Sequence, residues 1–218
     1  MDRKIISTIG YIGCIIFLVI FPHFVPLSFY SYAAVCLLAI YLMLRREGKN
    51  FRDIGLIKKK LNLRAVFLGA VTAIAWVAFM QFLYIPTIKY FFQVPDYIEY
   101  NFIKSSVPRL LMTIFAALII GGFYEEVVFR GYIQNVLEKR IFKGYDPLFS
   151  VLVTSLLFGL YHLQQDVFGI ISAILGGLYW SILYKEYDNL WIVIFSHGIF
   201  DTITLILIYR DAFGIFAF

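Results

Sequence analysis

Residues 5–44 contain no aspartate, glutamate, lysine or arginine. This charge-free run of 40 residues is about twice the length that one helix needs to cross the hydrocarbon core of a bilayer. Pro22 and Pro26 interrupt the run, and proline removes a helical hydrogen bond. The run therefore predicts two membrane helices, over residues 5–21 and 27–44.

Further apolar segments follow with similar lengths, and they predict helices over residues 65–88, 110–140, 148–162, 167–184 and 190–209. The sequence thus predicts an all-α fold, a polytopic transmembrane bundle of about seven to eight helices. We expect a single integral membrane domain over residues 1–218. In it, residues 1–109 supply N-terminal helices and a basic loop, and residues 110–209 carry the ionisable motifs.

The composition excludes several classes of protein. Hydrophobic residues make up 61% of the chain and charged residues 15%, with a mean hydropathy of +0.83. A soluble domain is about half apolar and a quarter charged, and could not bury this much apolar surface. A soluble enzyme, a disordered protein and a nucleic-acid binder are therefore excluded, and the lipid bilayer is the expected surrounding. Cys14 and Cys36 lie within apolar segments, which favours packed thiols over a disulfide or a metal site.

The distribution of basic residues predicts an orientation. Eight of the 19 lie between Arg45 and Arg64, and no small-residue cleavage site follows the first apolar segment, so we expect a retained first helix rather than a signal peptide. Alternating the helices from a cytoplasmic N-terminus puts 14 basic residues inside and four outside. The inner ones are Arg3, Lys4, the eight of the loop, Lys139, Arg140, Lys143 and Lys185. We expect a multi-pass protein of a bacterial plasma membrane.

A pair of glutamates interrupts the apolar segment 110–140. Glu126 and Arg130 are four residues apart, so on a helix they share one face, and Glu125 is rotated by about 100° from Glu126. An ion pair at a helix surface would account for Glu126 and Arg130 but would leave Glu125 unpaired. Ionisable groups inside membrane segments are costly and usually face a partner or a cavity.

Two histidines occur in later apolar segments. His162 ends the motif Phe158-Gly-Leu-Tyr-His162, and a lone histidine in such a place is more often a packed residue than a catalyst. His197 and Asp201 are four residues apart, so Asp201 could fix the tautomer of His197 or keep it protonated.

The depth of these groups decides whether they can meet. If the helix over residues 110–140 is continuous, Glu125 lies about 22 Å from the cytoplasmic end of that helix. His162 and His197 lie about 21 Å and about 13 Å from the cytoplasmic ends of their own helices. These depths predict one shared cavity, which we expect to open toward the cytoplasm.

The three motifs, in this order and spacing, resemble those of the CPBP intramembrane proteases. This family is also called the CAAX-protease or Abi family, and its eukaryotic relatives are type II CAAX prenyl endopeptidases. The motifs are Glu125-Glu126-Val-Val-Phe-Arg130, Phe158-Gly-Leu-Tyr-His162 and His197-Gly-Ile-Phe-Asp201. The resemblance covers roughly residues 110–209.

The resemblance implies an intramembrane endopeptidase acting on a membrane-associated or lipid-modified peptide or protein. It makes Glu125 the general base, with His162 helping to hold the water, and maps His197 and Asp201 onto the pair that stabilises the oxyanion. Glu126 and Arg130 would be supporting or substrate-orienting groups. Better-known relatives have asparagine in place of Asp201. An ionised aspartate cannot donate a hydrogen bond, so we expect Asp201 to orient a protonated His197 that does.

Several alternatives remain open at this point. Glu125, His162 and His197 match a catalytic zinc ligand set, whereas a metal-free mechanism driven by glutamate fits equally well. The substrate could be a CAAX end, a peptide precursor or a bacteriocin. A non-proteolytic scaffold or immunity protein that binds a peptide is the main alternative, and a transporter with a proton relay is a third.

Overall fold

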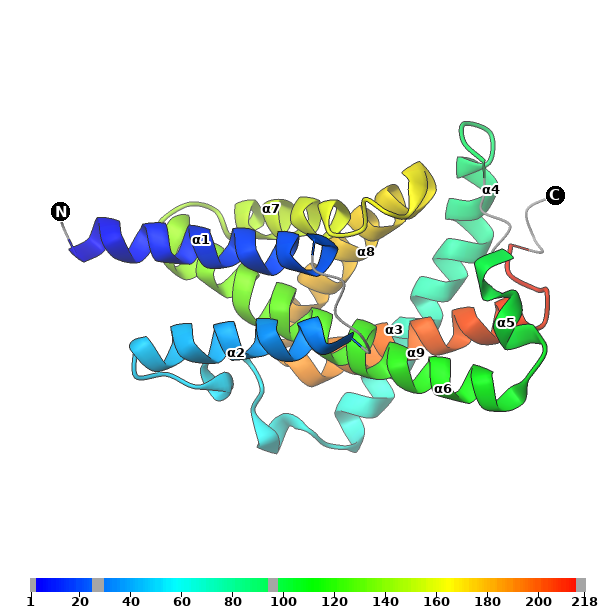
Figure 1. The fold of residues 1–218 in the computed structure, drawn as a ribbon, viewed down its shortest axis with the longest axis horizontal. Helices are drawn as coiled ribbons and strands as arrows, with labels where there is room; N and C mark the ends of the chain where they lie inside the picture. The colour runs from blue at the N-terminus through cyan, green and yellow to red at the C-terminus, as the bar shows by residue number, and fades with distance from the viewer. Residues whose placement is uncertain (1–2, 25–29, 94–97, 215–218) are drawn as a thin grey trace.

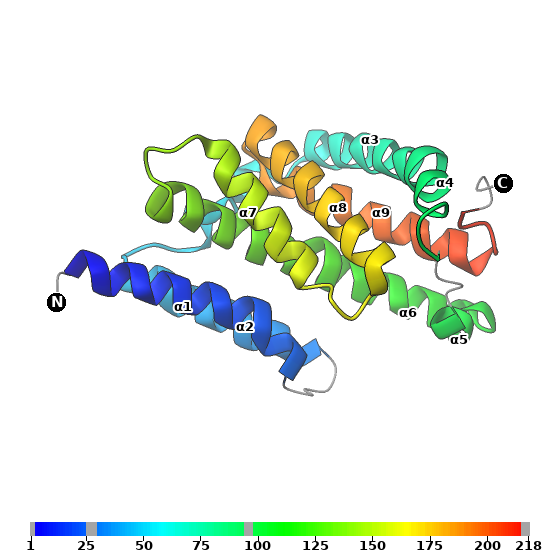
Figure 2. The same ribbon diagram turned by 90° about the horizontal axis from the view of Figure 1, so that it is seen from above.

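The computed structural model describes residues 3–24, 30–93 and 98–214, and within these ranges it is all-helical (Figure 1). The prediction of an all-α membrane bundle is confirmed. Helices α1 (Arg3–Phe24) and α2 (Ser31–Arg46) form an antiparallel pair, which both views show side by side (Figures 1 and 2). Helix α1 passes through Pro22 and ends three residues later than predicted, whereas Pro26 lies outside the described residues.

The second half of the chain is dominated by one long helix, Val107–Ile141. It begins as α6 (Val107–Ala117) and continues through three π-helical stretches, Leu118–Glu125, Val127–Gln134 and Leu137–Ile141. We refer to Val107–Ile141 as the long helix. It is continuous past Arg130, as the shared depth of the ionisable groups requires.

The remaining helices pack around the long helix. Helix α3 (Leu63–Phe79) continues through the π-helical turn Met80–Tyr84 into α4 (Ile85–Ile88), and α5 (Asn101–Lys104) is short. Helices α7 (Pro147–Leu160) and α8 (Asp166–Tyr187) pack against each other, and α9 (Leu190–Tyr209) lies between α3 and the long helix (Figure 2).

Within the described residues, five helical segments are long and apolar enough to cross a membrane: Ser7–Phe24, Leu63–Ile88, Val107–Ile141, Asp166–Tyr187 and Leu190–Tyr209. Helices α2 and α7, also predicted as spans, are shorter, with 16 and 14 residues. Large apolar side chains stay exposed along helix faces, among them Ile9, Ile16 and Ile20 of α1 and Leu111, Met112 and Phe115 of α6. The chain is therefore a multi-pass integral membrane protein whose outer face is suited to lipid.

Polar residues set where the helices begin. The side chain of Asn62 accepts a hydrogen bond from the backbone N–H of Ala65 at 3.0 Å, and Asp146 accepts from that of Leu148 at 2.8 Å. Asn189 caps α9 in the same way at 3.1 Å. Such caps satisfy backbone donors that the helix itself leaves free.

Glycines allow α9 to approach the long helix closely. A Cβ added at Gly122 would lie only 2.9 Å from the Cα of Gly198. A larger side chain at Gly122 would push the two helices apart, and allowing such an approach is the usual role of small residues between membrane helices. Gly122 is three residues before Glu125 and Gly198 is one residue after His197, so this close approach helps to bring the glutamate pair and His197 together.

The basic loop folds back onto the protein. Lys60 forms an ion pair with Asp188 at 2.8 Å, and the indole N–H of Trp191 donates to the carbonyl oxygen of Ile57 at 3.1 Å. Ile54 is buried, and its carbonyl accepts from the Tyr184 hydroxyl at 3.4 Å. The loop therefore packs against the turn between α8 and α9.

Candidate active site

Glu126 and Arg130 form a buried ion pair on the long helix. The Arg130 Nη1 atom lies 3.0 Å from Glu126 Oε1, and both side chains have no exposed surface. The four-residue spacing predicted this contact, but complete burial contradicts the alternative of a surface ion pair. The Arg130 guanidinium also donates to the carbonyl of Gly177 at 3.3 Å and lies over the ring of Phe158, 4.4 Å from its centroid.

His197 is held by the same carboxylate. Its Nδ1 atom lies 2.7 Å from Glu126 Oε1, and its ring stacks on Trp180 with centroids 3.8 Å apart and planes at 21°. A carboxylate only accepts hydrogen bonds, so the Nδ1 atom carries a proton and donates it. Glu126 therefore links the charge of Arg130 to the orientation of the imidazole. Spacing along the chain could not indicate this contact, because 71 residues separate the two partners.

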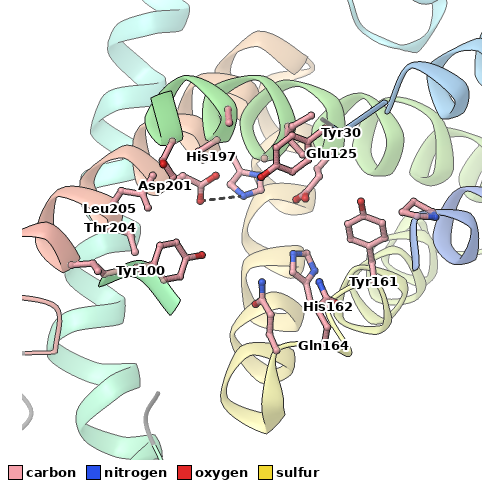
Figure 3. Close-up of a pocket in the computed structure, with 18 of the residues that line it drawn as sticks. Tyr30, Tyr100, Glu125, Tyr161, His162, Gln164, His197, Asp201, Thr204 and Leu205 are labelled. Carbon is pink, nitrogen blue, oxygen red and sulfur yellow. Dashed lines mark ion pairs between the residues drawn. The ribbon is translucent and has the colours of Figure 1, made fainter. Parts of the chain in front are cut away.

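Asp201 faces the other side of the imidazole. Its Oδ1 atom lies 3.7 Å from His197 Nε2, too far for a direct hydrogen bond but within ion-pair distance (Figure 3). We expected Asp201 to orient His197, whereas Glu126 makes the hydrogen bond that does so. Gly121 lies against the carboxylate, and a Cβ there would overlap Asp201 Oδ2.

His162 lies in the turn between α7 and α8, two residues beyond the end of α7. Its Nδ1 atom is 2.7 Å from the carbonyl oxygen of Phe158. Because a carbonyl only accepts, Nδ1 carries the proton, and Nε2 of the neutral ring is an acceptor. The turn thus fixes the tautomer of His162 without help from another side chain.

One cavity of about 610 Å³ brings four of the six predicted residues together. Glu125, His162, His197 and Asp201 line it, and in Figure 3 Glu125 and His162 point into it from different helices. Glu126 and Arg130 are not among the lining residues and lie behind this wall. The cavity is also lined by Pro22, His23, Tyr30, Tyr32, Tyr100, Phe102, Thr113, Ala116, Ala117, Ile120, Gly121, Tyr161, Gln164, Gln165, Thr204, Leu205 and Ile208.

A family model described as Rce1-like type II CAAX prenyl endopeptidase matches residues 107–203. The match runs from the first residue of the long helix into α9 and contains all six predicted site residues. Residues 107–203 form an Rce1-like type II CAAX prenyl endopeptidase domain. The resemblance drawn from the three motifs is confirmed, and the domain belongs to a peptidase family. Comparison of the chain with curated proteins and with solved structures finds no significant match.

The endopeptidase domain does not form a metal-ligand cluster within the described residues. No group of three or more histidine, cysteine, aspartate or glutamate side chains in that part of the chain is arranged to hold a metal ion. Glu125, His162 and His197 line the same cavity, but the arrangement of these donors does not fit a bound zinc. Each histidine commits its Nδ1 atom to a hydrogen bond, so Nε2 is the ring nitrogen that remains available toward the cavity.

The structure places the cavity and the N-terminus at opposite ends of the helices. The N-terminus and the cavity were both expected to face the cytoplasm. The cavity, however, is lined by the end of α1, the start of α2, the α7–α8 turn and the last turns of α9. All of these lie at helix ends opposite those joined to the basic loop. The two expectations therefore exclude each other, because adjacent helices alternate in direction.

The first helices contribute more than the sequence indicated. The sequence shows no catalytic motif in residues 1–109. Four of them from α1 and α2, namely Pro22, His23, Tyr30 and Tyr32, line the cavity of the endopeptidase domain. Aromatic residues grouped near one end of the apolar segments are the sequence signal that could have indicated this.

Proposed function

We propose that the chain is an intramembrane endopeptidase that hydrolyses a peptide bond in a membrane-associated or lipid-modified polypeptide. The observation that carries the proposal is the convergence of Glu125, His162, His197 and Asp201 on one cavity. These residues come from three different helical segments. A packing role would not require four polar side chains to face the same space inside a membrane protein.

Glu125 is the general base in this proposal. A water held between its carboxylate and the Nε2 atom of His162 gives up a proton to Glu125 and forms a bond to the carbonyl carbon. Glu125 then passes the proton to the leaving amine as the carbon–nitrogen bond breaks. The free acceptor on His162 Nε2 supports this role, since the Phe158 carbonyl already fixes the other nitrogen.

His197 stabilises the oxyanion that forms in the same step. In its doubly protonated form the imidazole offers Nε2–H toward the cavity, while Nδ1 stays bound to Glu126. Glu126 and Arg130 are positioning residues, since both are buried behind the cavity wall and touch the reacting atoms only through His197. Asp201 balances the charge of His197 from the other side.

The test compares purified wild-type protein with Glu125→Gln on a panel of membrane-anchored peptides, including prenylated CAAX peptides and bacterial pheromone precursors. We expect cleavage by the wild type and none by the variant. Glu138→Gln is the matched control, because it changes a glutamate on the same long helix that only pairs with Lys185 at the surface, at 2.7 Å. Cleavage that survives Glu125→Gln would show that the proposed mechanism is wrong.

The same panel separates the alternatives. Each reaction is repeated with a chelator, and equal rates with and without it are expected for chemistry carried by the side chains alone. Peptides that bind the wild type and Glu125→Gln equally, with no cleavage by either, would instead support a non-proteolytic binding protein.

A further inference from the structure

All the residues at the mouth of the cavity belong to one side of the helix topology. Pro22 and His23 end α1, Tyr30 and Tyr32 begin α2, and Gln164 and Gln165 form the α7–α8 turn. Tyr100, Phe102, Leu205 and Ile208 come from α5 and the last turns of α9. Among the described residues that line the cavity, none belongs to the segments 45–64, 139–147 or 185–190.

Those three segments form the opposite side, which we call the basic end. The structure holds them together through contacts between elements: Arg140 pairs with Glu47 at 2.5 Å, Lys60 with Asp188 at 2.8 Å, and Lys185 with Glu138 at 2.7 Å. Together with the N-terminus, the basic end carries 14 of the 19 lysines and arginines. Only Lys89, Lys104, Arg109 and Arg210 lie on the side of the cavity mouth, and Lys104 is paired with Asp211 at 2.5 Å.

This asymmetry orients the protein. Segments rich in lysine and arginine that flank membrane helices stay in the cytoplasm. The basic end is therefore cytoplasmic, and the mouth of the cavity opens on the other face of the membrane. Four tyrosines at or near this mouth, Tyr30, Tyr32, Tyr100 and Tyr161, suit the membrane–water interface, where tyrosine is enriched.

The lining also restricts which part of a polypeptide can enter. Two carboxylates, Glu125 and Asp201, face the cavity, and no lysine or arginine is among its described lining residues. The Arg130 guanidinium is fully buried and bound to Glu126 and to the carbonyl of Gly177. Even with His197 protonated, the carboxylates of Glu125 and Asp201 leave the lining with a net negative charge, which disfavours a free C-terminal carboxylate, whereas an internal segment brings no such charge.

We propose that the substrate is an internal segment of an exported, membrane-anchored polypeptide, which enters the cavity from the face of the membrane opposite the cytoplasm. The proposal rests on the proposed endopeptidase function and names its substrate class. A cytoplasmic chain end, the usual place of a prenylated cysteine, lies on the wrong side of the membrane and carries the wrong charge.

The first experiment maps the two faces without using activity. In a Cys14→Ser, Cys36→Ser background, Gln164→Cys places a thiol at the cavity mouth and Lys143→Cys places one at the basic end, both at exposed positions. A membrane-impermeant maleimide applied to intact cells is expected to label Gln164→Cys and to leave Lys143→Cys unlabelled until the cells are permeabilised. The reverse pattern would overturn the proposal. Leu163→Cys and Lys139→Cys form a second exposed pair if either first variant fails to accumulate.

The second experiment locates the cut. New N-termini in membrane proteins are compared between cells that express the wild type and cells that express Glu125→Gln. We expect Glu125-dependent termini that map to extracytoplasmic, internal segments. Termini confined to cytoplasmic chain ends would overturn the substrate class. If no terminus depends on Glu125, the endopeptidase function fails, whereas the orientation is still decided by the labelling.

Discussion

The Nδ1 atom of His197 lies 2.7 Å from Glu126 Oε1, the same oxygen that accepts from Arg130 Nη1 at 3.0 Å. One carboxylate oxygen thus connects a charge on the long helix with an imidazole on α9. The face of the imidazole stacks on Trp180, 3.8 Å between centroids, so both its direction and its plane are fixed. The ring is positioned before a substrate arrives, which is the condition for effective electrostatic stabilisation of an oxyanion.

Replacing Glu126 with glutamine should cost both stability and rate. The substitution leaves the fully buried Arg130 charge without its counter-ion, and breaking a buried pair typically costs about 3–5 kcal/mol. We expect a lower melting temperature in detergent and a reduced kcat at unchanged KM, because His197 loses its fixed orientation. Glu138→Gln breaks only an exposed pair and should cost at most about 1 kcal/mol. Equal melting temperatures for the two variants would contradict this account of Glu126.

Replacing Asp201 with asparagine should be tolerated. Asp201 lies 3.7 Å from His197 Nε2, so it makes no direct hydrogen bond that the substitution would remove. Asparagine has nearly the same shape and can itself donate to an oxyanion. We expect peptide cleavage to fall by no more than about tenfold, equivalent to about 1.4 kcal/mol. A near-total loss of cleavage by Asp201→Asn, with the melting temperature unchanged, would mean that the carboxylate has another task, such as binding a metal.

The sequence predicted the helices and the Glu126–Arg130 pair because both depend on local information. Apolar segment length identifies a span, and a four-residue spacing identifies a shared helix face. The contact of Glu126 with His197 and the stacking of Trp180 depend instead on how the long helix, α8 and α9 pack. Packing of this kind is set by close approaches such as Gly122 to Gly198, which spacing along the chain does not reveal.

The expectation that the cavity and the N-terminus share one side of the membrane was wrong for a related reason. Depth was counted along each helix from its inner end, and this places Glu125 and His162 at a common level but does not say which way the space between them opens. Opening is decided by the residues that close the other side. On the basic-end side of Glu125 and His197 the interior is filled by the buried Glu126–Arg130 pair and by Trp180, whereas tyrosines and glutamines surround the mouth.

Glu47 should make stability depend on pH at the basic end. The Glu47 carboxylate accepts a hydrogen bond from the Tyr11 hydroxyl. It also accepts one from Lys49 at 2.5 Å and pairs with Arg140 at 2.5 Å. Glu47 therefore connects α1 and α2 to the end of the long helix. Partial burial favours its neutral form, but these donors and charges outweigh burial and lower its pKa below the ordinary value of 4.5. A carboxyl whose pKa is lowered by folding stabilises the protein above its unfolded pKa and loses this effect as the pH falls through the folded pKa.

Glu47→Gln should therefore reduce the melting temperature at pH 7 by a few degrees, corresponding to about 1 kcal/mol for a partly exposed network. The difference between this variant and the wild type should shrink steadily below about pH 4.5. Scanning fluorimetry in detergent across this range checks both statements. Glu186→Gln, at an exposed position near the end of α8, is the control and should leave the melting temperature unchanged at pH 7. A Glu47→Gln deficit that persists undiminished at low pH would argue against the ionic origin of the effect.

Adding a single methyl group at Gly121 should impair catalysis more than folding. A Cβ there would overlap Asp201 Oδ2 and would come within 3.8 Å of His197 Nε2, so the aspartate must move to make room. Because misplacing a catalytic group by about 1 Å can reduce the rate by about a hundredfold, we expect Gly121→Ala to lower kcat by about one to two orders of magnitude.

Gly13→Ala on α1 is the control, since a Cβ there meets no other atom within 4 Å. The melting temperature of Gly121→Ala should stay close to that of the wild type, since Asp201 borders the open cavity into which it can turn. Full peptide cleavage by Gly121→Ala would place Asp201 outside the working part of the site, and would leave His197, held by Glu126, to stabilise the oxyanion without it.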